Sequence, residues 1–214
     1  MLMPLHEWLL ANPILARSFD RKLRLYAVSC CRRRWDLFEA DLCRRAVDAA
    51  ERLADGRADK LELATIHDAI MAIPTPNAQS HCIENMVLKL ISVTGMQCAS
   101  AAAIDLGAAT GWDHFERVVE GQAPLLRRVV GNPFRPVAFD PLWRTSAVVE
   151  VADSLYADRA FDRMPILADA LEDAACNHPG ILGHCRDSGP PARGRWVVDK
   201  LLAGRTRRSP LQFP

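Results

Sequence analysis

Four side chains near the C-terminal end are of the types that bind zinc: Cys176, His178, His184 and Cys185. Thiolate and imidazole groups are the donors that zinc prefers, and four of them close a tetrahedral site. The spacing is poor for that purpose, because adjacent His184 and Cys185 on a helix would point about 100° apart. We therefore expect no metal and no other cofactor, with Cys176 a small buried residue and His184 a satisfied polar residue.

Carboxylates offer acid–base chemistry in the same region. Asp169, Glu172 and Asp173 lie on one short predicted helix, where Asp169 and Glu172 share a face. A hydrolase would use such a pair together with a histidine. A solvated helix face, with Asp162 as its cap and Arg163 paired to one of the carboxylates, explains the same residues more simply. A hydrolase is therefore the weakest of our functional hypotheses, and we lean toward a protein that is not an enzyme.

Adjacent Cys30 and Cys31 precede three arginines, whose charge would lower the pKa of a nearby thiol. Adjacent cysteines are hard to bridge, and both lie on the apolar stripe of a predicted helix, so we expect core packing. The chain has 7 cysteines, an odd number without regular spacing, which suits reduced thiols better than a disulfide framework.

Two groups of arginines are of the type that binds phosphate. They are Arg32, Arg33 and Arg34 in the N-terminal half, and Arg205, Arg207 and Arg208 in the C-terminal tail. Consecutive arginines spread around most of a helix, and no aromatic residues alternate with them to stack on bases. A solvated face that pairs with the acidic middle of the chain is favoured, and nucleic-acid binding is the alternative.

The best candidates for recognition lie beside two proline-rich segments. Arg135 stands between Pro133-Phe134 and Pro136, which hold its backbone extended, and a preorganised guanidinium binds carboxylate or phosphate with two hydrogen bonds. The structural alternative is an ion pair of Arg135 with Asp140, Asp162 or Asp169.

The second proline-rich segment is the loop 187–191, which contains Gly-Pro-Pro. The residues around it are His184, Arg186, Arg193 and Trp196. Together they would form a small pocket with one aromatic wall and two cations, which is our leading candidate for a site.

Composition places few limits on function. The 214 residues are 50% hydrophobic and 25% charged, with a formal net charge of +1, so no global field attracts nucleic acid or anionic membrane. Residues 17–57 carry 11 basic and 7 acidic groups, residues 59–120 carry 3 and 8, and residues 185–214 carry 7 and 2. No apolar stretch would span a bilayer, and the first residues lack signal-peptide features, so we expect a cytoplasmic protein without a membrane partner.

Helical periodicity runs through most of the chain. From Asp20 onward one apolar face carries Leu23, Tyr26, Ala27, Cys30, Cys31 and Trp35. Further helices are predicted for 38–55, ending near Gly56, for 59–72, for 78–106 with a possible break at Gly95, and for 113–130 with Gly131 as its cap. After a proline-rich connector at 131–141, helices are predicted for 142–156, 164–175 and 194–203.

The pattern predicts an all-α, multi-helix single domain. Its parts would be an N-terminal helical part (1–130), a C-terminal helical part packed on it (131–204) and a flexible basic tail (205–214).

Several segments resemble a large family of paralogous bacterial proteins of the planctomycete type, some of which carry the SMI1/KNR4 label. They are RKLRLYAVSCCRRRW (21–35), GNPFRPVAFDPLW (131–143), ADRAFDRMPILADALEDAAC (157–176) and HCR (184–186) with RGRWVVDKLLAG (193–204). The label implies an α+β fold and partner or toxin binding, but the helical periodicity opposes that fold. The resemblance implies no particular activity. Where the family pattern has His and Cys around the Arg-Gly pair, this chain has other residues, Arg195 among them.

We therefore expect a non-catalytic helical module that binds a protein partner or forms part of a complex. Arg135, Arg186, Arg193 and Trp196 would anchor the partner, because arginine and tryptophan dominate interface energetics.

Overall fold

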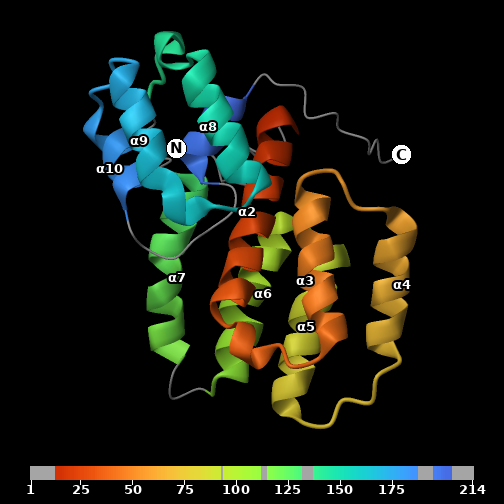
Figure 1. The fold of residues 1–214 in the computed structure, drawn as a ribbon. Helices are drawn as coiled ribbons and strands as arrows, with labels where there is room; N and C mark the ends of the chain where they lie inside the picture. Colours follow the sequence, from red (N-terminus) through yellow and green to blue (C-terminus); the bar gives the residue numbers. More distant parts are fainter. Residues whose placement is uncertain (1–12, 93, 112–114, 132–136, 188–194, 204–214) are drawn as a thin grey trace, which may run out of the picture. The chain divides into compact units, whose positions relative to one another are not determined.

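The structure is a computed structural model that describes residues 13–92, 94–111, 115–131, 137–187 and 195–203. Within these ranges it contains helices and no strand, so the all-α prediction is confirmed (Figure 1). Contacts between residues divide the chain into two compact units. Of the described residues, those up to Ala123 form the N-terminal unit, and those from Pro124 onward form the C-terminal unit.

The described helices of the N-terminal unit are α2 (Pro13–Arg33), the short 3₁₀ helix η1 (Trp35–Leu37), α3 (Asp41–Ala54), α4 (Lys60–Met71), α5 (Ala78–Ser92) and α6 (Gly95–Ala109). Helix α7 (Phe115–Val130) begins in this unit and continues into the next. Helices α2, α3, α5 and α6 form a closed ring in which each packs against the next, and α4 lies outside against α3 and α5. Each ring helix therefore has two neighbours over which to bury its apolar face.

The predicted apolar face of the first helix is confirmed for Leu23, Tyr26, Ala27, Cys30 and Cys31, all of which are buried. The predicted bounds are wrong at both ends. The helix begins at Pro13, seven residues before Asp20, and it ends at Arg33, so Trp35 is not part of it. Arg34 leaves the helical conformation (φ −117°, ψ 41°), and Trp35 stacks on Phe38 with 5.8 Å between ring centroids.

Local capping chemistry sets several other ends. The Asp59 carboxylate accepts the amide of Leu61 at the start of α4, and Thr94 and Gln97 form a capping box at the start of α6. The predicted break at Gly95 is confirmed, because α5 ends at Ser92 and α6 begins at Gly95. Gly56 lies just after α3 with a left-handed backbone (φ +68°), as predicted for a helix stop.

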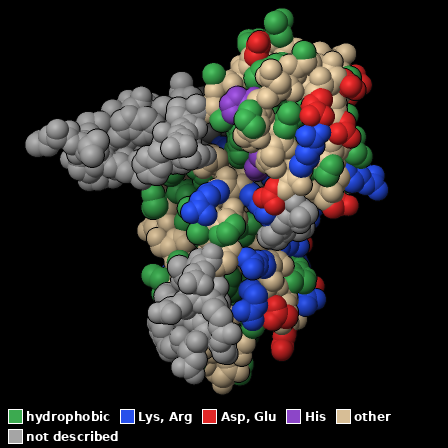
Figure 2. All heavy atoms as spheres, turned by 90° about the vertical axis from the view of Figure 1, so that its left-hand side faces the viewer, with side chains coloured by type: hydrophobic (Ala, Val, Ile, Leu, Met, Phe, Trp, Pro, Cys, Tyr) green, Lys and Arg blue, Asp and Glu red, His purple; other side chains and the backbone are tan. Residues whose placement is uncertain are grey.

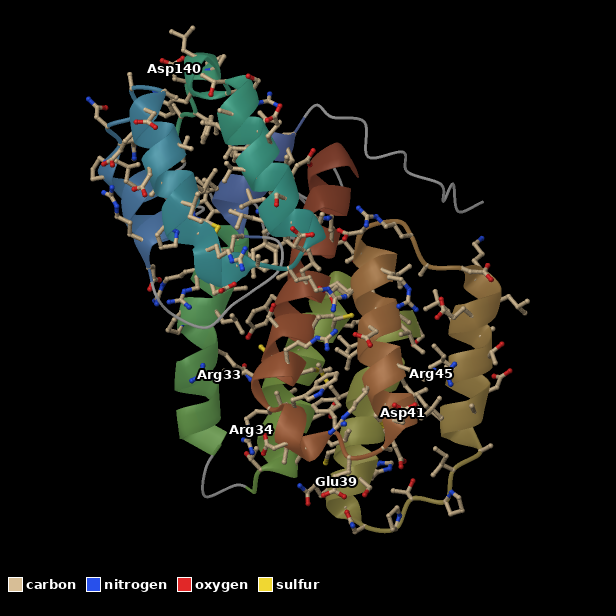
Figure 3. All side chains as sticks on the ribbon, viewed as in Figure 1. Arg33, Arg34, Glu39, Asp41, Arg45 and Asp140 are labelled. Carbon is tan, nitrogen blue, oxygen red and sulfur yellow. The ribbon has the colours of Figure 1, made fainter. Side chains whose placement is uncertain are left out.

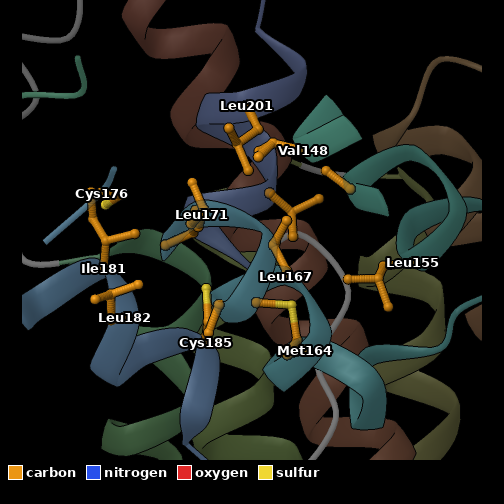
Figure 4. Packing of buried hydrophobic residues seen from close by; sticks show 14 of the residues in the cluster. Val148, Leu155, Met164, Leu167, Leu171, Cys176, Ile181, Leu182, Cys185 and Leu201 are labelled. Atoms are coloured by element: carbon orange, nitrogen blue, oxygen red, sulfur yellow. The ribbon is translucent and has the colours of Figure 1, made fainter. Parts of the chain in front are cut away.

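The C-terminal unit holds η3 (Pro141–Trp143), α8 (Ser146–Ala157), η4 (Phe161–Arg163), α9 (Met164–Asp173), α10 (Pro179–Arg186) and α11 (Trp196–Leu202). Helix α8 packs on α9 and α11, and α10 packs on the same two helices. Leu167, Leu171, Ile181 and Leu201 fill the centre of this ring and are fully buried (Figure 4). Helix α10 was not predicted, because its eight residues include two glycines and a proline.

The described end of the proline-rich connector, residues 137–141, packs on this second core. Val137, Phe139 and Trp143 pack against the buried cluster of the C-terminal unit. The division between the two units falls at Ala123 and Pro124, inside α7, and not at 131–141. In the part of the chain that the structure describes, no helix has the length and apolar character needed to cross a membrane.

Candidate recognition site

The two motif-bearing segments of the C-terminal unit meet at Gly131 and Trp196. Gly131 ends α7 with a left-handed backbone (φ +83°), and its amide donates to the Arg127 carbonyl at 2.9 Å, as predicted for a helix cap. A Cβ added at Gly131 would lie 3.2 Å from Cγ of Trp196. A side chain at Gly131 would therefore lie closer to Trp196 than an ordinary contact, and the indole would have to shift by a few tenths of an ångström to accept it.

Trp196 also contacts the imidazole of His184, with ring centroids 5.3 Å apart and planes tilted by 50°. The structure thus brings together two of the four residues expected around the Gly-Pro-Pro loop. Arg193 lies outside the described residues, as do Arg135, Arg205, Arg207 and Arg208.

Two buried arginines that sequence reasoning did not select lie beside this contact. Arg195 is 1% exposed and Arg128 is 8% exposed. Arg128 donates through Nε and Nη2 to Oδ2 of Asp187, at 3.0 and 2.6 Å. Burial lowers the pKa of Arg195, the charge of Arg128 lowers it further, and the charge of Asp187 opposes both effects. Asp187 is therefore the counter-ion of Arg128, and it ties α7 to the end of α10.

Arg186 lies away from His184 and Trp196. Its Nη2 atom is 2.5 Å from Oε2 of Glu172 and 3.7 Å from Oδ1 of Asp169, so it joins α10 to α9. The hydrogen bond that Arg186 donates to Glu172 raises the pKa of Arg186. Residues two apart on a helix point in nearly opposite directions, which explains why Arg186 and His184 cannot line one pocket. Arg186 is therefore not beside His184 and Trp196, as the expected pocket required, and Arg193, its other cation, lies outside the described residues.

The two other expectations for α9 also change. Asp162 does not cap the helix, because the N-cap position is Arg163, which has no capping hydrogen bond from its side chain. Arg163 is exposed and forms no ion pair with any residue that the structure describes. Glu172 and Asp169 are instead neutralised by Arg186, an arrangement typical of a solvated helix face.

The possible zinc ligands are placed for structural roles. Nδ1 of His178 accepts the amide of Gly180 at 3.1 Å and so caps α10. Cys176 and Cys185 are buried, and burial raises the pKa of Cys185 to about 12. Across the described ranges, no group of three or more His, Cys, Asp or Glu side chains is arranged to hold a metal ion.

Cys30 and Cys31, which lie on the apolar face of α2, are equally unreactive. Cys30 and Cys31 are 2% and 0% exposed, so their predicted place in the core is confirmed. Burial raises the pKa of Cys30 to about 12 and that of Cys31 well above its ordinary value. A thiol that stays protonated at neutral pH is a poor nucleophile.

The N-terminal arginines are engaged inside their own unit. Arg32 pairs with Asp48 and Glu51, and its guanidinium lies 4.4 Å from the Trp35 ring centroid. Arg34 pairs with Asp36, and Arg33 donates to the Gly121 carbonyl at 2.6 Å (Figure 3). The predicted pairing with the acidic middle of the chain is wrong for Arg32 and Arg34, because their carboxylate partners lie in the basic segment 17–57 itself. On the face shown in Figure 2, basic and acidic side chains of the described residues are interspersed.

An exposed leucine is the feature that the sequence did not reveal. Leu142 is 79% exposed at the centre of η3. The turn around it is anchored on both sides, because Oδ1 of Asp140 accepts the Leu142 amide at 2.9 Å and Arg144 donates to the Ala203 carbonyl at 2.6 Å. Phe139 and Trp143 meet edge to face with 5.4 Å between centroids and pack on the core. Figure 3 labels Asp140 at one end of the C-terminal unit.

Comparison of the chain with family models, with curated proteins and with solved structures gave no match. The candidate site is therefore defined by geometry alone: an anchored turn from Asp140 to Arg144 that presents Leu142.

Proposed function

We propose that the protein is a non-catalytic helical interaction module or complex subunit, whose C-terminal unit binds a protein partner through the anchored turn. The observation that carries the proposal is the 79% exposure of Leu142 on a turn whose neighbouring side chains are fixed. A single exposed leucine is common on protein surfaces, but one whose backbone is already anchored loses less conformational freedom on binding. Its burial by a partner would contribute about 1.5–3 kcal/mol.

The chemistry of the described side chains supports binding over catalysis. The thiols at Cys30, Cys31 and Cys185 are buried with raised pKa values, and His184 lies against Trp196. The α9 carboxylates that a hydrolase would need are paired with Arg186. Nucleic-acid binding has less support, because Arg32 and Arg34 already pair with carboxylates and Arg33 with a backbone carbonyl.

The test is affinity capture of the tagged protein from its native cells, at two salt concentrations and with and without nuclease. Leu142→Asp is the test variant. Leu61→Asp is its matched control, because Leu61 is 73% exposed on α4 of the other unit. We expect the wild type and Leu61→Asp to retain a stoichiometric protein partner that survives nuclease, and Leu142→Asp to lose it.

Both substitutions lie on the surface and should change the free energy of unfolding by no more than about 0.5 kcal/mol. Equal capture by the two variants would overturn the turn as the binding site. Recovery of nucleic acid alone, lost at high salt, would replace the proposal with the nucleic-acid alternative.

A further inference from the structure

Helix α7 crosses the division between the two units without interruption. It runs from Phe115 to Val130, and the division falls between Ala123 and Pro124. Pro124 is the one residue of the helix that cannot donate a backbone hydrogen bond, so the Glu120 carbonyl has no partner at its usual helical position. Sharp bends in helices are almost always found at such prolines.

The residues just before Pro124 are held by the N-terminal unit. Arg33 on α2 donates to the carbonyl of Gly121 at 2.6 Å. The Gln122 side chain is 6% exposed, donates to the Ala102 carbonyl of α6 at 2.8 Å and accepts the hydroxyl of Tyr26 at 3.1 Å. Two consecutive residues of α7 are therefore fixed to α2 and α6 directly before the proline.

The residues after Pro124 are held by the C-terminal unit. Arg128 is bound to Asp187, and Gly131 closes the helix against Trp196. Printed contacts thus flank a short stretch, from Gln122 to Arg128, in which Pro124 removes one helical hydrogen bond.

We propose that α7 is a hinge. Pro124 allows the helix to bend, and the contacts of Gly121 with Arg33 and of Gln122 with α6 restrict the bending to the residues of α7 that follow Gln122. Hinges typically absorb a change of angle over a few residues between two rigid bodies. The proposal does not depend on the protein-partner function proposed above.

The experiment measures the spread of distances between spin labels by double electron–electron resonance on the full chain. Labels are introduced through non-canonical amino acids, because the 7 native cysteines preclude specific thiol labelling. One pair joins exposed Ala64 on α4 to exposed Asp173 on α9, across the two units. The reference pair, Ala64 and Ile104, lies within the N-terminal unit, where Ile104 is 55% exposed.

We expect the cross-unit distribution of the wild type to be broader than that of the reference pair. Pro124→Ala should narrow it to the reference width and give the amide at position 124 slow hydrogen exchange. Pro179→Ala is the matched control, because Pro179 is in the first turn of α10, where its missing N–H has no helical partner. It should leave the distribution broad.

Arg33→Met provides an independent readout, because it keeps most of the side chain but removes the hydrogen bond to Gly121. It should broaden the cross-unit distribution and speed amide exchange in residues 121–125. A wild-type distribution as narrow as the reference pair would overturn the hinge. The same conclusion would follow if Pro124→Ala left a broad distribution unchanged.

Discussion

Replacing Gly131 by alanine tests whether the contact with Trp196 constrains the C-terminal unit. An alanine there must adopt φ near +83°, and its Cβ would lie 3.2 Å from Cγ and 3.5 Å from two other side-chain atoms of Trp196. The left-handed backbone costs about 1–2 kcal/mol for a residue with a Cβ. Carbon atoms prefer separations of about 3.5–4 Å, so relieving the contact should cost about 1–2 kcal/mol more.

Gly111 provides the matched control. It also follows a helix with a left-handed backbone, at φ +88°, but a Cβ added there would meet nothing within 4 Å. Gly111→Ala should therefore show the backbone cost alone, about 1–2 kcal/mol, and Gly131→Ala a total of about 2–4 kcal/mol. Urea denaturation followed by hydrogen-exchange mass spectrometry measures both, because it assigns each transition to its own unit.

A double-mutant cycle isolates the contact itself. In the Trp196→Ala background, Gly131→Ala should cost only as much as Gly111→Ala, which gives a coupling of about 1–2 kcal/mol. If Gly131→Ala costs no more than Gly111→Ala in the wild-type background, the contact with Trp196 does not constrain the fold and the reasoning is refuted.

Three further predictions concern stability. Gly183→Ala should stabilise the C-terminal unit by about 0.5–1 kcal/mol in urea denaturation, because a Cβ on this exposed face of α10 would meet nothing within 4 Å; a loss of stability would contradict it. Asp187→Asn should lower the free energy of unfolding by about 1–2 kcal/mol. This is less than for a deeply buried pair, because the Asp187 side chain is 45% exposed. An unchanged urea midpoint would show that Arg128 is satisfied without the Asp187 charge. Burial raises the thiol pKa from 9.0 to about 11 or 12 at four positions, so the folded state favours the protonated thiol more than the unfolded state does. This contribution to the free energy of unfolding is complete below pH 9 and is lost as the pH rises toward the folded-state pKa values. The four are Cys30, Cys43, Cys98 and Cys185. The urea midpoint should fall over that pH range, and a flat profile would contradict the burial argument.

The helices were predictable because their signals are local. The apolar spacing from Leu23 to Cys31 identifies one buried face, and glycines at positions 56, 95 and 131 mark ends or breaks that the structure reproduces. The same reasoning failed at Trp35, whose position continues the helical spacing although the chain has left the helix at Arg34. Periodicity reports which residues share a face, and it does not report where the backbone conformation stops.

The candidate site was less predictable, because it depends on contacts between distant residues. Arg128 and Asp187 are 59 residues apart, and nothing in the spacing of either residue indicates their ion pair. Arg195 is an arginine in an ordinary charged sequence, yet packing makes it one of the largest fully buried side chains among the described residues. Arg186 was an attractive candidate for the pocket, but the direction of its side chain on α10 places it with Glu172.

The amino-acid sequence by itself therefore determined the all-α class, most helix positions and the apolar faces, because side-chain spacing and capping act within a few residues. Only the tertiary structure decided which polar groups form ion pairs and which residues remain exposed. Arg32 and Arg34 form ion pairs with carboxylates of their own unit. Leu142 is exposed to solvent, whereas the aromatic residues beside it, Phe139 and Trp143, pack against the core. The physical reason is that pairing and burial are settled by the packing of helices from separate parts of the chain, which no local pattern encodes.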